Sequence, residues 1–188
     1  MSKFIFRLKC LFFAPLYLFF SLYKDNEKEL RRWEALVRAV PYKSSFLCFI
    51  RMCAGFPEYR SLYLFRLGGV GEFLSYFVSH SINTFFITKS ENIGSGLVLW
   101  HGYSTIIFAE SVGENCEIWH NVTIGRAHNL CRRPRIGNNV KVCAGAIVLG
   151  DIEIGDNCII GAGAVVTKSI PANSVVVGNN PAKIIKTI

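Results

Sequence analysis

"GDIEIGDNCIIGAGAVV" (residues 150–166) places an aliphatic residue at every sixth position, at Ile154, Ile160 and Val166. Toward the N-terminus the same spacing runs through Ile93, Leu99, Ile106, Val112, Ile118, Ile124, Ile136, Val142 and Val148. The position four further on is small or apolar in most repeats, as at Cys116, Val122, Val140, Ala146, Ile152, Cys158 and Ala164. Helices repeat at about 3.6 residues and strands at about 2. A period of six therefore predicts a β-solenoid, in which three short strands with their corners make one coil and the aliphatic residues point inward. Gly is expected to recur because the corners need backbone freedom that a Cβ would oppose.

These repeats resemble those of the hexapeptide-repeat acyltransferases, and in particular serine O-acetyltransferase and its relatives in bacterial polysaccharide gene clusters. The similarity covers residues 57–188. It is carried by "PEYRSLYLFRLG" (57–68), "IGSGLVLWHG" (93–102), "VTIG" (122–125), "RRPRIGNNV" (132–140), "GDIEIGDNCIIGAGAVVTKSIPANS" (150–174) and "GNNPAKII" (178–185). The resemblance implies a mainly β fold, a left-handed parallel β-helix with an N-terminal α-helical region. It also implies a homotrimer with catalysis between chains.

The chain is expected to contain three regions. Residues 1–24 form a hydrophobic segment with basic flanks, residues 25–84 an α-helical cap, and residues 85–188 the β-helix with an extruded loop at 126–135. Within the cap, helices are predicted at 25–40, 43–54, 58–67 and 70–82, separated by Gly and Pro.

The net charge of +8 is concentrated before the repeats. The sequence carries no nucleic-acid recognition motif, so we expect an anionic membrane surface or glycan as the partner of this charge and no nucleic acid. The uncharged stretch at 10–23 is short for a span, contains Pro15, and lacks a cleavage site. We expect it to lie in the membrane interface of a cytoplasmic protein, on the inner face of the membrane. Packing against helices of the same or a neighbouring subunit, and a signal anchor, remain alternatives.

The resemblance assigns catalysis to a histidine that removes the proton of an acceptor hydroxyl as it attacks acetyl-CoA. His101 aligns with that residue. Leu99 and Ile106 are seven positions apart rather than six, so one extra residue follows His101. We expect it to reshape the acceptor side of the pocket, the alternative being a neutral corner insertion. His120, 19 residues later, is predicted to lie near His101 on the next coil, where it would orient His101 or contact the acceptor. A surface or stacked ring without a catalytic role is the alternative.

The predicted acceptor site combines arginines with aromatic residues. Arg132 and Arg133 lie in the loop 126–135, where the resembled serine enzymes have R-H-P, so Arg133 replaces the histidine. Trp100 and Phe86 stand where those enzymes carry aspartates. A serine ammonium would find no carboxylate at either position, and burying an unpaired charge is unfavourable. We therefore expect a sugar of an envelope polysaccharide or its precursor as acceptor, with L-serine, in cysteine biosynthesis, as the alternative.

The donor site is assigned by the same resemblance. Acetyl-CoA is expected along the C-terminal coils, at Ala144, Ala162, Lys168 and Lys183, with Asn121 as a helper beside His120. The histidine spacing does not match a zinc site, so no metal is expected. The seven cysteines include no C-x-x-C pair and are expected to be reduced thiols. A solenoid scaffold without catalysis is a further alternative, which failure to bind coenzyme A would favour.

Overall fold

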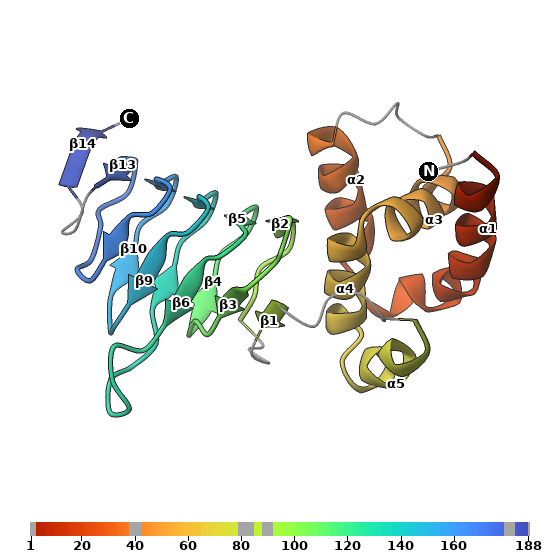
Figure 1. Ribbon diagram of the computed structural model, residues 1–188, viewed down its shortest axis with the longest axis horizontal. Coiled ribbons are helices and arrows are strands. Elements are labelled where there is room, and N and C mark those ends of the chain that lie inside the picture. Colours follow the sequence, from red (N-terminus) through yellow and green to blue (C-terminus); the bar gives the residue numbers. More distant parts are fainter. Residues whose placement is uncertain (1–2, 38–42, 79–84, 88–91, 179–182, 188) are drawn as a thin grey trace. The chain divides into compact units, whose positions relative to one another are not determined.

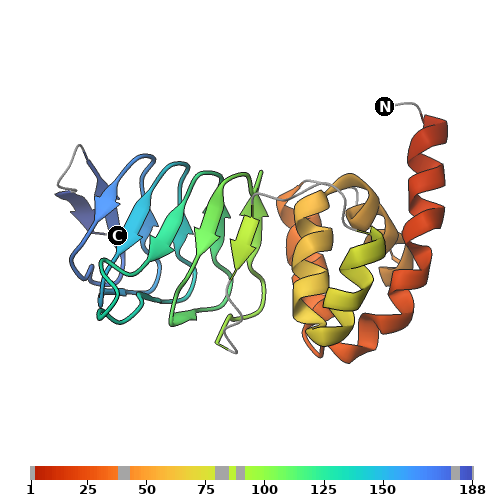
Figure 2. The same cartoon turned by 60° about the horizontal axis from the view of Figure 1, so that its bottom comes forward.

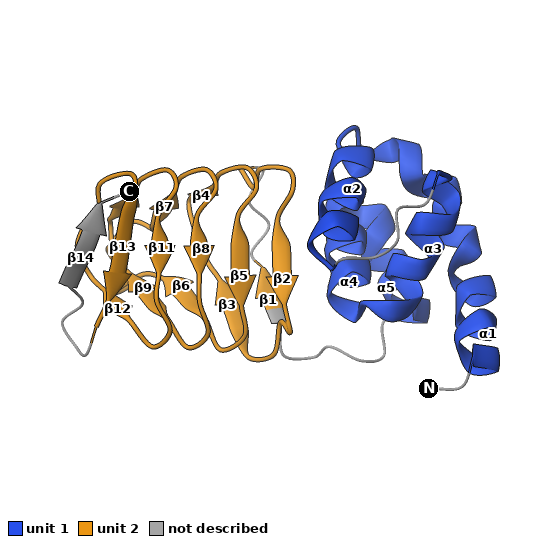
Figure 3. Ribbon diagram, turned by 90° about the horizontal axis from the view of Figure 1, so that it is seen from above, with its two compact units in different colours: residues 1–83 blue, residues 84–188 orange. Residues whose placement is uncertain are grey.

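The computed structural model describes residues 3–37, 43–78, 85–87, 92–178 and 183–187 (Figure 1). The chain divides into two compact units, residues 1–83 and residues 84–188, which Figure 3 colours separately. Each unit is described by itself. The N-terminal segment 1–24 belongs to the same unit as the helices that follow it.

Unit 1 is built from helices. Their bounds are α1 Lys3–Phe13, η1 Ala14–Leu22, α2 Asn26–Leu36, α3 Ser45–Gly55, α4 Pro57–Arg66 and α5 Gly69–Val78. Ser44 caps α3, its hydroxyl accepting a hydrogen bond from the amide of Leu47, and Pro57 begins α4, where its missing N–H is not needed. Asp25, at the N-cap position of α2, makes no side-chain capping bond. The helices thus begin where local backbone chemistry favours them.

The core of unit 1 is aromatic. Trp33, Tyr59, Phe49 and Tyr63 are buried and form a chain of ring contacts in this order. The ring centroids of the three contacting pairs are 5.5, 6.2 and 4.8 Å apart. The N-terminal segment reaches this core, because Leu16 is buried and its carbonyl accepts a 2.9 Å hydrogen bond from the Tyr63 hydroxyl. Part of the segment predicted to lie in the membrane interface therefore packs against helices of its own chain.

Residues Lys3–Leu22 form the one helical stretch, within the described chain, that is long and apolar enough to cross a membrane by length and composition. Only 11% of its most apolar window is buried inside unit 1. Much of this apolar surface therefore faces outward.

Unit 2 is a parallel β-helix of short strands, and Figure 2 shows its stacked coils. The strands are β1 Phe85–Ile87, β2 Val98–Trp100, β3 Thr105–Ile107, β4 Ser111–Val112, β5 Glu117–Trp119, β6 Thr123–Gly125, β7 Arg135–Ile136, β8 Lys141–Val142, β9 Ile147–Leu149, β10 Glu153–Ile154, β11 Ile159–Ile160, β12 Val165–Val166, β13 Ser174–Val177 and β14 Lys183–Thr187.

The strands form three sheets that the chain visits in turn. The described orders are β14-β13-β11-β8-β5-β2, β1-β3-β6-β9-β12 and β10-β7-β4. Neighbouring strands are parallel, except that β14 turns back to pair antiparallel with β13. Each coil thus contributes one strand to each face, as the six-residue period predicts. The left-handed sense of the coil stays a prediction from the resemblance.

The predicted inward positions form the core of unit 2. Leu99, Ile118, Ile124, Ile154 and Ile160 are at most 1% exposed. The small or apolar positions four residues after the aliphatic ones are also buried, at Cys116, Val122, Val140, Ala146, Ile152, Cys158 and Ala164. The repeat register is therefore confirmed along most of the solenoid.

The predicted inward position Ile106 is wrong. Ile106 is 44% exposed, whereas Ile107 is fully buried and pairs with the inward Ile124 of the next coil. Leu99 and Ile107 are eight positions apart, and Ile107 and Val112 only five. The one extra residue seen in the spacing is thus a net count: two residues are inserted between Leu99 and Ile107, and one is missing between Ile107 and Val112.

Glycines that directly follow an inward aliphatic residue, such as Gly113 after Val112, have a different cause from the one predicted. At Gly113 an added Cβ would lie 2.5 Å from the carbonyl carbon of Gly137 in the next coil, and the backbone there has no positive φ. Close stacking of coils, rather than backbone freedom, excludes a side chain at this corner. Left-handed conformations occur elsewhere, at glycines such as Gly145 and Gly163, which have the predicted backbone freedom, and at asparagines such as Asn139 and Asn157, whose side-chain amides form a ladder between coils.

Candidate active site

His101 lies at the enlarged corner that follows β2. Its side chain is exposed and its backbone is left-handed, with φ 57°, which is uncommon for a residue other than Gly. The turn is closed by a hydrogen bond from the amide of Tyr103 to the carbonyl of His101, and Ser104 is left-handed as well. The two extra residues thus fold into a tight turn that presents His101 at the surface of the solenoid.

His120 lies beside His101 on the next coil, as predicted from the 19-residue spacing. The ring centroids are 6.2 Å apart, and the ring planes are inclined by 58°. Nδ1 of His120 is buried and has no hydrogen-bond partner within the part of the chain that the structure describes. A buried ring nitrogen without a partner is unfavourable. This nitrogen is thus suited to a partner from a bound molecule or a second chain.

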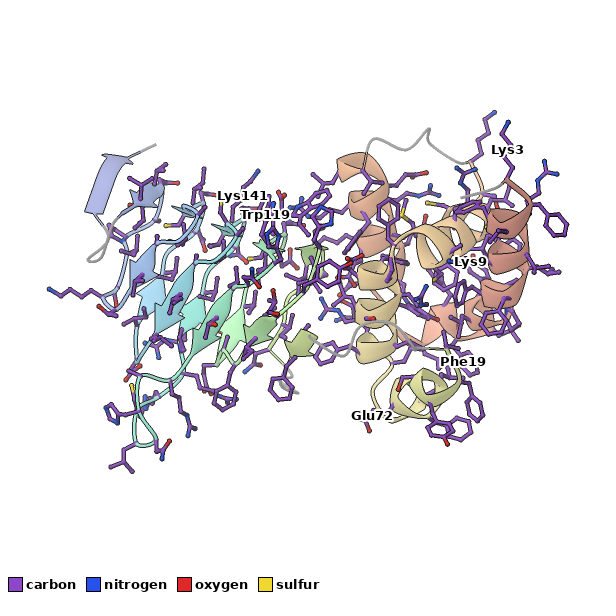
Figure 4. All side chains as sticks on the ribbon, viewed as in Figure 1. Lys3, Lys9, Phe19, Glu72, Trp119 and Lys141 are labelled. Atoms are coloured by element: carbon purple, nitrogen blue, oxygen red, sulfur yellow. The ribbon has the colours of Figure 1, made fainter. Side chains whose placement is uncertain are left out.

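Trp100 forms a pair that the sequence analysis did not include. Trp100 stacks at a tilt over Trp119, with ring centroids 6.2 Å apart, and its indole N–H donates a 3.0 Å hydrogen bond to the Glu117 carboxylate. Glu117 is 5% exposed and also lies 3.3 Å from the Lys141 ammonium. Figure 4 labels Trp119 and Lys141, which lie close together on unit 2. The signal in the sequence was the 19-residue spacing, which relates Trp100 to Trp119 as it relates the two histidines.

Phe86 does not join Trp100 in one aromatic wall. Phe86 is in β1, paired in register with Ile106 of β3, whereas Trp100 belongs to the sheet of β2 and β5. The corner that carries His101 separates these two faces. Phe86 is 56% exposed and Trp100 is half-buried, and the two lie on different sheets of the same chain.

The two arginines predicted for the acceptor site, Arg132 and Arg133, have different environments. Arg133 donates a 2.9 Å hydrogen bond to the Glu110 carboxylate, and its guanidinium lies 5.1 Å from the centre of the Phe108 ring. Arg126 approaches the same ring at 5.3 Å. Arg132 is exposed. Arg133 thus fastens the loop to the solenoid, and Arg132 is the arginine whose exposure suits contact with an anionic acceptor.

Residues predicted for the donor share an edge with the histidines. Ala144 and Ala162 occupy the same place in their coils as His120, because each lies two residues after an inward residue of the same sheet. The carbonyl of Ala144 accepts a hydrogen bond from the amide of Gly163. Their small side chains leave space along this edge. Asn121 is exposed and left-handed, at φ 56°, so the corner itself accounts for its residue type.

The two predicted lysines lie elsewhere in the fold. Lys168 is exposed and follows β12, whereas Ala162 precedes that strand, so the two flank one face of the solenoid. Lys183 begins β14, and its side chain lies outside the described residues.

The cysteines and acidic residues do not form a metal centre in the described ranges, where no cluster of three His, Cys, Asp or Glu is found. All seven cysteines are free thiols. Burial raises the pKa of the Cys48 thiol to about 12 and also raises that of Cys158. Such thiols stay protonated and are poor nucleophiles.

Comparison with known proteins places this arrangement in a family. The serine acetyltransferase of Helicobacter pylori is 35% identical over 142 residues, which cover 70% of this chain and 83% of that protein. The chain belongs to the hexapeptide-repeat acyltransferases. The family profile described as "Bacterial transferase hexapeptide (six repeats)" matches residues 133–168.

Other relatives include acetyltransferases named for different acceptors. WcaB of Escherichia coli, named as a colanic acid biosynthesis acetyltransferase, is 42% identical over 103 residues, covering 53% of this chain and 64% of that protein. The crystal structure of serine acetyltransferase from Brucella abortus in complex with coenzyme A has a TM-score of 0.69 at 30% identity, covering 90% of this chain and 71% of that chain. The matched part of this chain spans between about a quarter and a half of the length of the first curated relatives it matches.

Proposed function

We propose that this protein transfers the acetyl group of acetyl-CoA to an acceptor hydroxyl, with His101 as general base. The observation that carries the proposal is the single edge of unit 2 that bears His101, His120 and the small residues Ala144 and Ala162. An exposed imidazole beside an edge with space for an extended donor meets the needs of direct transfer. Membership in the acyltransferase family, and a relative solved with coenzyme A, support the same donor.

The proposed step balances in protons and bonds. His101 accepts the proton of the acceptor hydroxyl as the hydroxyl oxygen forms a bond to the thioester carbonyl carbon. The carbon–sulfur bond then breaks, and the imidazolium returns the proton to the departing thiolate of coenzyme A. His120, 6.2 Å away, is placed to orient His101 or to contact the acceptor.

L-Serine is the acceptor that the comparisons favour. The relative from Helicobacter pylori and the structural neighbour solved with coenzyme A are both serine acetyltransferases. The sequence departs from those enzymes at Trp100 and Phe86. The carboxylate closest to Trp100 on its own sheet, Glu117, is buried between the indole N–H and Lys141, and so is already paired.

A sugar hydroxyl is the second candidate acceptor, and the Trp100 and Trp119 pair favours it. Two half-buried indoles beside the histidines offer an apolar surface for the face of a pyranose ring. The similarity to WcaB points the same way. Arg132 would then meet a carboxylate or phosphate of the glycan.

We also propose the homotrimer and the cytoplasmic location that the resemblance and composition imply. The buried, unpartnered Nδ1 of His120 supports a site completed by a second chain. Mass photometry of the purified protein tests the subunit number, and a monomer that is fully active would contradict the shared site.

The decisive experiment measures coenzyme A release from acetyl-CoA in the presence of L-serine or of a panel of envelope sugars and lipid-linked oligosaccharides. Turnover that is lost in His101→Ala identifies the acceptor. Turnover with serine would remove the sugar candidate, and turnover with a glycan alone would remove serine. Absence of coenzyme A binding in calorimetry would overturn the acetyl-transfer proposal and favour a scaffold.

A further inference from the structure

The outer side of α1 is apolar. Its exposed side chains are Phe4, Ile5, Leu8, Leu11 and Phe12, between 48% and 73% exposed. Phe4, Leu8 and Leu11 recur at intervals of four and three residues, so they share one side of the helix. The residues that turn toward unit 1 are different, since Phe6 and Cys10 are half-buried and Phe13 is buried. One helix therefore has two apolar sides, and only one of them is covered within the chain.

Cationic residues flank this uncovered stripe. Arg7 and Lys9 lie on opposite sides of the stripe by helical spacing, and Lys3 lies on the side of Arg7. Figure 4 labels Lys3 and Lys9 along α1. The segment from Lys3 to Leu22 contains no acidic residue. An apolar stripe bordered by cations is the pattern of a helix that lies in the interface of an anionic bilayer.

A pocket of about 680 Å³ opens between α1 and α3 beside the stripe. Three cations line it, Lys3, Arg7 and Arg51, together with the apolar Phe6, Leu47 and Ile50. The guanidinium of Arg51 lies 5.5 Å from the centre of the Phe6 ring, so a charged group is held against an apolar wall. A molecule that joins a phosphate to a hydrocarbon chain satisfies both parts of this lining.

The η1 part of this helical segment is fixed to unit 1, which favours lying on a membrane over crossing it. The Tyr63 hydroxyl holds the carbonyl of Leu16, and Tyr17 and Phe20 pack against Phe49 with ring centroids 5.5 and 5.3 Å apart. Spanning a bilayer would expose these core contacts to lipid and detach η1 from α3 and α4. The packing therefore leaves the outer stripe of α1 as the surface that can meet lipid.

We propose that unit 1 docks on an anionic phospholipid bilayer through the outer stripe of α1, with a lipid phosphate in the pocket between α1 and α3. Docking of this kind would bring the β-helix to membrane-linked acceptors, yet it does not depend on the acetyl-transfer reaction. Each cation near an anionic surface strengthens binding by roughly five-fold. Loss of two pocket cations should therefore weaken binding by roughly 25-fold.

The test is sedimentation of the full chain with phosphatidylcholine vesicles, with and without phosphatidylglycerol. We expect binding only with phosphatidylglycerol, and a decrease when salt is added. Arg7→Gln with Arg51→Gln should weaken it by the stated factor, whereas Lys28→Gln with Arg32→Gln on α2, which removes the same net charge, should have little effect. Leu8→Gln with Leu11→Gln should abolish binding, and Leu130→Gln, at a residue 94% exposed in unit 2, should not. Circular dichroism melting checks that every variant is folded.

Four results would overturn the proposal. Equal binding to both kinds of vesicle would show that anionic lipid has no role. An equal loss of vesicle binding in the α2 control would show that net charge, and not the pocket, determines binding. A change of subunit number in Leu8→Gln with Leu11→Gln, without a change in vesicle binding, would assign the stripe to a second copy of the chain. Resistance of the membrane-bound protein to alkaline carbonate extraction would show a spanning helix. Because the readout is vesicle binding, none of these results bears on the proposed acetyl transfer.

Discussion

The imidazole rings of His101 and His120 lie with their centroids 6.2 Å apart on neighbouring coils, and Trp100 and Trp119, which precede them, are paired in the register of β2 with β5. The offset of 19 residues within each pair exceeds the regular coil by one. Two residues gained after Leu99 and one lost before Val112 produce this offset. The insertion therefore enlarges the corner that presents His101 without disturbing the inward stack on either side.

Replacement of His101 by Ala is predicted to reduce the kcat of acetyl transfer by about 10²- to 10⁴-fold, because a positioned general base contributes that much. His120→Ala should cause a smaller loss, since the neighbouring ring orients the base or the acceptor. Coenzyme A release under saturating acetyl-CoA measures both. His128→Ala, in the exposed loop, serves as the control, and a loss there equal to that of His101→Ala would contradict the assignment.

Replacement of Trp100 separates the two acceptor candidates. With a sugar acceptor, Trp100→Ala should raise KM roughly five-fold, because aromatic contacts of this kind are worth about 1 kcal/mol. Trp100→Phe should keep most of the affinity while removing the N–H that Glu117 accepts. With L-serine as acceptor, the Ala and Phe variants should behave alike. Steady-state kinetics with each acceptor distinguishes these patterns.

A side chain at Gly113 is predicted to destabilise unit 2. The Cβ of Gly113→Ala would lie 2.5 Å from backbone atoms of Gly137, which cannot move without separating two coils. Overpacking of this kind costs about 1–3 kcal/mol, and we expect the melting temperature of unit 2 to fall by roughly 4–8 °C for each kcal/mol lost. Gly125→Ala is the matched control, since its Cβ would meet no atom closer than 3.9 Å. Equal melting temperatures for the two variants would contradict the account of the glycine corner.

The sequence predicted the repeat better than it predicted the site. Inward residues such as Leu99 and Ile160 were found by counting, because a solenoid stacks equivalent positions and repeats its pattern in every coil. Counting failed at Ile106, since two nearby length changes of opposite sign leave only their sum visible in the spacing. The proximity of His101 and His120 followed from the coil length.

Contacts between unlike residues were harder to predict. The hydrogen bond from Trp100 to Glu117 joins outward positions on different strands, where residue type does not follow the repeat. Likewise, Phe86 and Trp100 were grouped by alignment with other enzymes, which does not say on which face of the prism each residue lies. Assigning such contacts required the strand register.

The buried ion pair of Arg66 with Glu29 gives the last prediction, for unit 1. Two guanidinium nitrogens donate to the two carboxylate oxygens at 3.3 and 3.1 Å, and the side chains are 6% and 4% exposed. Arg66→Met should reduce the free energy of unfolding by about 3–5 kcal/mol, because the buried carboxylate loses its cation. Adding Glu29→Gln to that variant should restore part of the loss. Glu27→Gln, at an exposed pair with Arg31 on the same helix, should cost below about 1 kcal/mol. Urea denaturation of the full chain measures these differences, and an Arg66→Met variant as stable as Glu27→Gln would show that the pair is solvated in solution.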